Sequence, residues 1–291
     1  MEPPASNPPA ATSFVSEGLR MDAVLHRPDD AAAKVPAFIA LNGFGGKKEG
    51  SEDGARMLTR LGYAVLRYDS RGCGSSEGMR ARTVPLEQVE DVKNAVTWLA
   101  QQPGIDASRI GVVGQSFGAA VGIYAAGVDE RIAACISFGG WGDGAKKFRG
   151  QHASPEAWRR FMDMLENGRR RRARGEHFMV PRYDIVPIPP ALRGGLTPGG
   201  FMEFHFDAAE SMYAFRAIDV VERIAPRPLL LLHSARDSVT PSEQSVDLFK
   251  AAGQPTDLYL IAGIDHFGFD DTNPQLAGII TNWLRKHLPA R

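Results

Sequence analysis

The sequence has only two cysteines, no excess of either charge and no long hydrophobic run. Its two cysteines, Cys73 and Cys135, lack the C-x-x-C spacing or neighbouring histidines of a zinc or redox site. Lys plus Arg and Asp plus Glu both number 34, so no overall field favours nucleic acid or an anionic membrane. No apolar run approaches the roughly 20 residues that cross a bilayer. We therefore expect a cytoplasmic protein without metal or cofactor, whose partner is a small-molecule substrate rather than nucleic acid or membrane.

The N-terminal segment does not have the pattern of a secretion signal. Residues 1–13 are rich in Pro, Ala and Ser, without the basic start and apolar run of a secretion signal. We expect these residues to form a disordered tail. The remaining length fits one large α/β domain, for which 43% hydrophobic residues provide a sizeable core.

From residue 14 onward, the spacing of apolar residues alternates between that of strands and that of helices. A short hairpin is expected first, over 14–17 and 21–26. Later strands are expected at 36–41, 63–68, 109–113, 133–138, 228–233 and 257–261. Helices are expected between them at 52–61, 86–101, 117–126, 242–252 and 275–288. Alternating strands and helices predict a mostly parallel central sheet with helices on both faces.

The alternation breaks between Gly139 and about Ala217. An amphipathic segment at 154–167 is followed by an arginine run, and then by prolines and paired glycines dense enough to interrupt strands and helices. We expect residues 141–217 to form a cap or lid inserted into the core. The core itself is then divided into a first part, 14–140, and a second part, 218–291.

The pattern G-x-S-x-G occurs twice in the chain. The copy at 114–118 follows the apolar run 110–113 and precedes a predicted helix. In that context a sharp strand-to-helix turn lifts a serine hydroxyl out of the sheet. The copy at 74–78 follows a polar stretch, which predicts a surface turn instead. Context therefore selects Ser116 as the candidate nucleophile.

A serine nucleophile needs a base to remove its proton and a carboxylate to orient that base. Asp237 lies beyond the predicted strand 228–233 and before the next helix. A turn-capping role is the alternative for Asp237, although Ser242 can cap that helix itself. Among seven histidines, only His266 combines a loop after a strand with a position beyond both Ser116 and Asp237. The predicted catalytic residues are Ser116, Asp237 and His266.

Attack on a carbonyl develops negative charge on its oxygen, which each backbone N–H donor stabilises by about 3 kcal/mol. The amide of Phe117, directly after the nucleophile, is one expected donor. The glycine-rich loop 42–46 is expected to supply the other through Phe44, whose ring would face the substrate; the alternative is a glycine turn without a ligand. Trp141, at the start of the insertion, is the second expected substrate-binding side chain.

Together these features resemble the α/β-hydrolase family. The loop 42–46, the stretch 68–78 and the pentapeptide 114–118 are similar to those of serine aminopeptidase-like, dienelactone-hydrolase-like and Xaa-Pro peptidase-like hydrolases. The resemblance covers nearly the whole chain except the tail and the insertion. It implies the α/β-hydrolase fold and an acyl-enzyme mechanism without metal or organic cofactor. Many relatives carry His where this chain has Asn42, a change that affects only how the loop is positioned.

These expectations combine into a serine hydrolase of the carboxylesterase type (EC 3.1.1). Its expected substrate is a small to medium, hydrophobic carboxylic ester or lactone. Amidase or aminopeptidase-type hydrolysis and C–C bond hydrolysis by the same triad are alternatives. An alternative of another class is a noncatalytic receptor with the same fold. Such proteins usually lack a triad member, whereas all three positions are occupied here.

Overall fold

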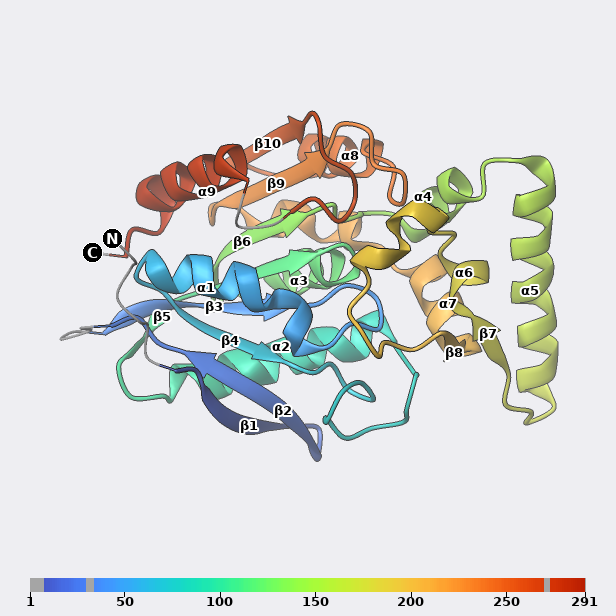
Figure 1. Cartoon of the computed structure of the whole chain (residues 1–291), viewed down its shortest axis with the longest axis horizontal. Helices are drawn as coiled ribbons and strands as arrows, with labels where there is room; N and C mark the ends of the chain where they lie inside the picture. The colour runs from blue at the N-terminus through green and yellow to red at the C-terminus, as the bar shows by residue number, and fades with distance from the viewer. Residues whose placement is uncertain (1–7, 30–33, 270–272, 291) are drawn as a thin grey trace.

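An eight-stranded sheet forms the centre of the molecule (Figure 1). The computed structural model describes residues 8–29, 34–269 and 273–290. The strand order is β1-β2-β4-β3-β5-β6-β9-β10; β2 pairs antiparallel with both β1 and β4, and the other neighbours are parallel. The strands span Ala10–Ser16 (β1), Leu19–His26 (β2), Val35–Leu41 (β3), Ala64–Tyr68 (β4), Ile105–Gln115 (β5), Ile132–Phe138 (β6), Leu229–Ser234 (β9) and Thr256–Ile261 (β10). The predicted mostly parallel sheet is confirmed.

Helices cover both faces of this sheet, as predicted. They span Glu52–Arg60 (α1), Pro85–Ala100 (α2), Phe117–Val128 (α3), Glu243–Ala251 (α8) and Pro274–His287 (α9). Successive side chains of a strand point to opposite faces. In β3, Ile39 and Leu41 accordingly pack in the core with α2, α3 and α8, while Phe38 and Ala40 pack in the core with α1 and α9. Figure 1 shows α1 and α9 on the near face of the sheet.

The register of the parallel strands brings their carboxyl ends to one edge. Leu41 of β3 and Ser137 of β6 both lie opposite Gly114 of β5, and Phe138 lies opposite Leu232 of β9. The loops that follow these strands therefore meet at the same edge, where ligands bind in sheets of this kind.

Two strands, β1 and β5, extend well beyond their predicted bounds. Strand β1 begins at Ala10, and its first residues pair with β2, so the part of the expected tail at 10–13 is a strand instead. The expected tail at 1–7 lies outside the described residues. Strand β5 covers 105–115 rather than 109–113. Backbone pairing with a neighbouring strand sets the bounds of β1 and β5, and the spacing of apolar residues does not reveal this pairing.

The chain between β6 and β9 folds beside the central sheet without joining it. Its helices are Gly144–Gln151 (α4), Pro155–Ala173 (α5), Arg182–Ile185 (α6) and Phe206–Ala214 (α7), and its strands Met179–Pro181 (β7) and Glu203–His205 (β8) pair only with each other. Figure 1 shows these elements beyond the carboxyl ends of the sheet strands. We propose this region as the cap, with the bounds 141–217.

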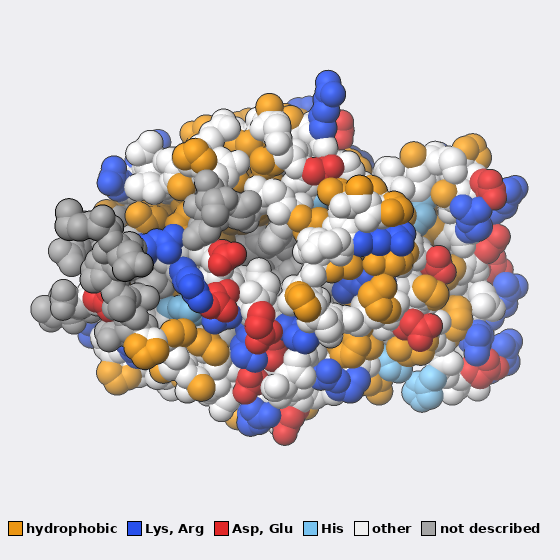
Figure 2. Space-filling model, in the orientation of Figure 1, with side chains coloured by type: hydrophobic (Ala, Val, Ile, Leu, Met, Phe, Trp, Pro, Cys, Tyr) orange, Lys and Arg blue, Asp and Glu red, His pale blue; other side chains and the backbone are white. Residues whose placement is uncertain are grey.

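The arginine run of α5 lies at the surface and is paired. Arg169 and Arg172 form ion pairs with Glu210, and Arg171 pairs with Glu176. Lys, Arg, Asp and Glu side chains alternate along this end of the molecule in Figure 2. Intermixed charges of this kind form a solvated face rather than an anion-binding one. In the part of the chain that is described, no helix is long and apolar enough to cross a membrane.

His26, at the end of β2, is a buried histidine whose titration affects stability. Its Nε2 accepts a hydrogen bond from Arg67 Nε at 2.7 Å, and burial together with the Arg67 charge lowers the pKa of His26 to about 4. The unfolded chain, with a His pKa near 6.5, binds more protons below that pH, so stability is lost as pH falls from about 6.5 towards 4. Between pH 7 and pH 5 we expect this histidine to remove about 2 kcal/mol from the free energy of unfolding.

Urea unfolding of the wild type and of His26→Gln at both pH values measures this loss. Glutamine can accept the Arg67 hydrogen bond but does not titrate in this range, so the variant should lose less stability on acidification. Equal losses in the two proteins would assign the acid sensitivity to other groups.

Candidate active site

The G-x-S-x-G copy at 114–118 forms a sharp turn from β5 into α3. Ser116 lies between them with φ 54° and ψ −114°, a conformation that L-residues rarely adopt. A Cβ atom on Gly114 would lie 2.5 Å from the backbone of Gly118, and a Cβ on Gly118 would lie 2.5 Å from the carbonyl oxygen of Asn42. Both glycines are therefore required for close backbone approach, and they allow the turn to present the Ser116 hydroxyl.

The copy at 74–78 packs around a carboxylate instead. Ser76 is 4% exposed; its hydroxyl donates to the carbonyl of Asp69 and accepts from the amide of Asp22. A Cβ on Gly74 would overlap the Asp69 carboxylate, which binds Lys48 Nζ at 2.8 Å. The segment is a turn with Ser75 and Glu77 exposed, as expected, while the buried Ser76 fixes it to Asp69 and Asp22.

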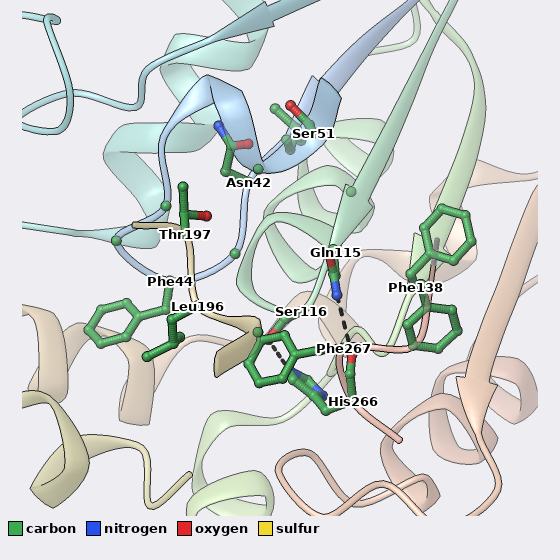
Figure 3. Close-up of a pocket in the computed structure, with 18 of the residues that line it drawn as sticks. Asn42, Phe44, Ser51, Gln115, Ser116, Phe138, Leu196, Thr197, His266 and Phe267 are labelled. Carbon is green, nitrogen blue, oxygen red and sulfur yellow. Dashed lines mark hydrogen bonds between the residues drawn. The ribbon is translucent and has the colours of Figure 1, made fainter. Parts of the chain in front are cut away.

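Ser116, His266 and Asp237 lie in hydrogen-bond contact although they are far apart in sequence. His266 Nε2 lies 2.9 Å from Ser116 Oγ, and His266 Nδ1 lies 2.7 Å from Asp237 Oδ2. Figure 3 shows the first of these contacts. His266 is 2% exposed and the Asp237 side chain is inaccessible to solvent. The structure brings together all three residues predicted from the sequence.

Asp237 is held as a carboxylate by four donors. Its Oδ1 accepts from the backbone amides of Val239 and Thr240, both at 2.7 Å. Its Oδ2 faces the rings of His266 and His233, at 2.7 and 3.3 Å. Burial by itself would raise the pKa of Asp237, but the hydrogen bonds from His233 and His266 hold it well below its usual range. An ionised acid in this place can orient the ring of His266.

His233 was not assigned a role by the sequence. It is fully buried near the end of β9, with Nε2 3.0 Å from the Thr240 carbonyl and Nδ1 2.6 Å from Ser245 Oγ. Because the Thr240 carbonyl can only accept, Nε2 carries the proton and Nδ1 accepts from Ser245. The signal available in the sequence was a histidine four residues before Asp237, near the end of the strand that precedes Asp237.

The loop that carries His266 is held from both sides. Asp265 accepts from the backbone amide of His266 at 2.7 Å and binds both the amide and the hydroxyl of Ser238. Gln115, the residue before the turn, donates from Nε2 to the carbonyl of His266 at 3.2 Å (Figure 3). These contacts fix the loop backbone, and none of them joins the Asp265 carboxylate to the imidazole ring.

The loop 42–46 offers a free backbone donor near Ser116. No described residue accepts a hydrogen bond from the amide of Phe44. The amide of Phe117 begins α3, and N–H groups in the first turn of a helix have no partner within the helix. Asn42 Nδ2 donates to the Tyr68 carbonyl at 3.0 Å and so anchors the start of the loop. Asn42 therefore positions the start of the loop through its side-chain amide.

A pocket of about 370 Å³ opens beside Ser116 and His266. Phe44, Leu196, Thr197 and Phe267 line it, together with other residues of the loop 42–46 and of the cap (Figure 3). The prediction for Trp141 was wrong. Trp141 is 1% exposed, lies edge-on to the ring of Phe215, and is not part of this lining.

The chain is similar to known proteins over most of its length. Residues 17–268 match the family model described as X-Pro dipeptidyl-peptidase (S15 family). An uncharacterized 31.7 kDa protein in the traX-finO intergenic region of Escherichia coli is 26% identical, over 94% of this chain and 98% of its own. Thiohydrolase aneE of Aspergillus aculeatus is 28% identical, over 81% of this chain and 80% of its own.

Solved structures share the fold. The crystal structure of the α/β hydrolase GrgF from Penicillium superimposes with a TM-score of 0.80 at 24% identity, covering 97% of this chain and 99% of that one. With a family match over residues 17–268 and a central sheet of this order, the chain belongs to the X-Pro dipeptidyl-peptidase (S15) family of α/β-hydrolases.

Proposed function

We propose that the protein is a serine hydrolase that cleaves a carboxylic ester or lactone through an acyl-enzyme intermediate. The observation that carries this proposal is the line of contacts from Ser116 Oγ through His266 to the Asp237 carboxylate, 2.9 and 2.7 Å long, beside a pocket. Nucleophile, base and orienting acid are all within hydrogen-bond reach, as acyl transfer of this type requires.

In the proposed mechanism, Ser116 Oγ attacks the acyl carbon while His266 Nε2 takes the hydroxyl proton. The amides of Phe44 and Phe117 stabilise the oxyanion that develops. When the tetrahedral intermediate collapses, the bond to the leaving alcohol breaks and His266 gives its proton to the alcohol oxygen. Water then attacks the acyl group, with His266 again as the base, and the acid is released as Ser116 recovers its proton.

The lining of the pocket supports a hydrophobic substrate of modest size. Phe44, Val186, Ile188, Leu196 and Phe267 provide an apolar wall, three of them from the cap. A volume of about 370 Å³ accommodates a small to medium molecule.

A thioester is the second candidate acyl donor, because one relative is named thiohydrolase and another acyltransferase. The same triad would act on it, and a thiolate leaves without the protonation that an amine needs. Amide hydrolysis is the third candidate, because the family is described as a dipeptidyl-peptidase. There His266 must protonate a poorer leaving group.

Parallel measurements of kcat/KM separate these substrates. We expect the highest value with p-nitrophenyl butyrate, a lower one with the butyryl thioester of N-acetylcysteamine, and the lowest with Ala-Pro-p-nitroanilide. A thioester value above the ester value would move the proposal to thioesters, and an equal or higher amide value would make the protein a peptidase. No turnover of any of the three, together with no fluorophosphonate adduct, would contradict an enzymatic function altogether.

A further inference from the structure

Arg182 is a buried cation in the wall of the pocket. It begins α6 in the cap, is 4% exposed, and lines the same pocket as Ser116. Its Nε donates to the Phe201 carbonyl at 2.8 Å and its Nη2 to the Phe44 carbonyl at 3.0 Å. The guanidinium lies over the rings of Phe44 and Phe204, 5.3 and 5.1 Å from their centroids. The cap thus contributes a buried positive charge to the pocket.

This charge has no counter-ion among the described residues. Arg182 forms no ion pair there, whereas the two other buried arginines do: Arg71 pairs with Asp91, and Arg67 pairs with Glu52 at 3.3 Å. Burial lowers the pKa of Arg182 from its usual range, with no carboxylate among the groups that act on it. Burying an unpaired cation is unfavourable, so a ligand that supplies the missing charge binds favourably.

The acidic residues of the pocket do not supply that charge. Glu49 and Asp53 line it from the turn before α1 and from α1 itself, where both are exposed to solvent. Glu49 lies 3.6 Å from Lys48 Nζ, and neither carboxylate forms an ion pair with Arg182. Water and salt screen exposed charges far more than buried ones, so Glu49 and Asp53 do not offset the charge of the buried Arg182.

Part of the guanidinium has no hydrogen-bond partner among the described residues. Arginine carries five N–H donors in a planar fork, and Arg182 uses one at Nε and one at Nη2 for the carbonyls of Phe201 and Phe44. No described residue accepts from its Nη1. Planar, charged donors of this kind match the two oxygens of a carboxylate.

We propose that Arg182 binds a free carboxylate of the substrate, so that the preferred substrate is an ester carrying a second, ionised acid group. The inference rests on the proposed function, because it concerns the substrate of that same triad. A half-ester of a dicarboxylic acid fits the chamber well, since its methylene chain contacts Val186, Ile188 and Leu196 while its carboxylate completes the charge of Arg182.

Three esters of equal chain length test the proposal: monomethyl adipate, methyl hexanoate and dimethyl adipate. We expect the wild type to show a kcat/KM about 10- to 100-fold higher for monomethyl adipate than for the two neutral esters. Arg182→Met should abolish this preference and Arg182→Lys should retain part of it. A matched pair with the charge on the alcohol, 3-butyryloxypropanoate and propyl butyrate, tells on which side of the ester the carboxylate binds.

The ratio of the rates separates recognition from a structural role. If Arg182 only holds the Phe44 carbonyl, Arg182→Met lowers kcat/KM equally for charged and neutral esters and the ratio is unchanged, which would overturn the proposal. Arg193→Met, at an exposed cap arginine that donates to the Ile188 carbonyl, is the control and should leave the ratio unaltered.

Two further results keep the inference distinct from the proposed function. Equal wild-type rates on charged and neutral esters, in both pairs, would refute the carboxylate site while leaving the hydrolase intact. No turnover of any ester and no phosphonate adduct would remove the proposed function itself. Should Arg182→Met fail to fold, calorimetry on Ser116→Ala decides: monomethyl adipate should bind at least 10-fold more tightly than methyl hexanoate, and equal affinities would overturn the site.

Discussion

Replacing Ser116 with alanine is expected to lower ester turnover by about 10⁶-fold, the scale on which loss of the nucleophile acts in serine hydrolases. No other described hydroxyl lies within hydrogen-bond distance of His266 Nε2, so no second nucleophile can replace it. The fold should be unchanged, because alanine keeps the same backbone conformation and the Ser116 amide still donates to the Phe138 carbonyl at 2.7 Å. Initial rates with p-nitrophenyl butyrate and mass spectrometry after fluorophosphonate treatment measure the effect.

The G-x-S-x-G copy at 74–78 provides the control for this experiment. Ser76→Ala removes a buried hydroxyl that bonds Asp69 and Asp22, so it should lower the melting temperature. It should nevertheless retain the phosphonate adduct and most of the activity. An adduct that persists in Ser116→Ala, or that disappears in Ser76→Ala while the protein is folded, would contradict the assignment of the nucleophile.

Asp237→Asn is expected to lower kcat by about 10⁴-fold, as loss of the orienting acid does in serine proteases. The physical reason lies in the four donors around the carboxylate. Val239 and Thr240 donate backbone N–H groups to Oδ1, so the asparagine must keep its oxygen there and turn its NH₂ towards His266. That NH₂ would donate to His266 Nδ1 and move the ring proton to Nε2, which then cannot accept the proton of Ser116.

Asp265→Asn is the matched control for the acid. Asp265 binds the backbone amide of His266 and the side chain of Ser238 but not the imidazole. We expect less than a tenfold change in kcat from this substitution. If Asp237→Asn kept near-native turnover while Asp265→Asn lost it, the orienting acid would have to be reassigned to Asp265. Circular dichroism of both variants checks that the comparison is made between folded proteins.

The parts of the site that follow from local chain direction were predictable from the sequence. Ser116 follows an apolar run and precedes a helix, and Asp237 and His266 each follow a strand. In a parallel sheet those positions converge whatever the side-chain packing. The loop 42–46 was predictable for the same reason, because it follows β3, the neighbour of β5.

The parts that depend on packing between distant segments were not predictable. Trp141 was expected in the pocket because it begins the insertion, but its ring turns into the core beside Phe215. Arg182 was overlooked because nothing in the proline-rich stretch around it indicates which side chain reaches the loop 42–46. His233 reads as an ordinary strand residue until its distance to Asp237 is known.

Because Ser116 has a positive φ, thermal stability and catalysis favour different residues at this position. A non-glycine residue in that region of backbone space is strained by about 1–3 kcal/mol, and glycine there is not. Selection of a random library for melting temperature alone would therefore favour Ser116→Gly and enrich for inactive protein. Engineering for durability must accordingly score activity at every round, or exclude position 116 from randomisation.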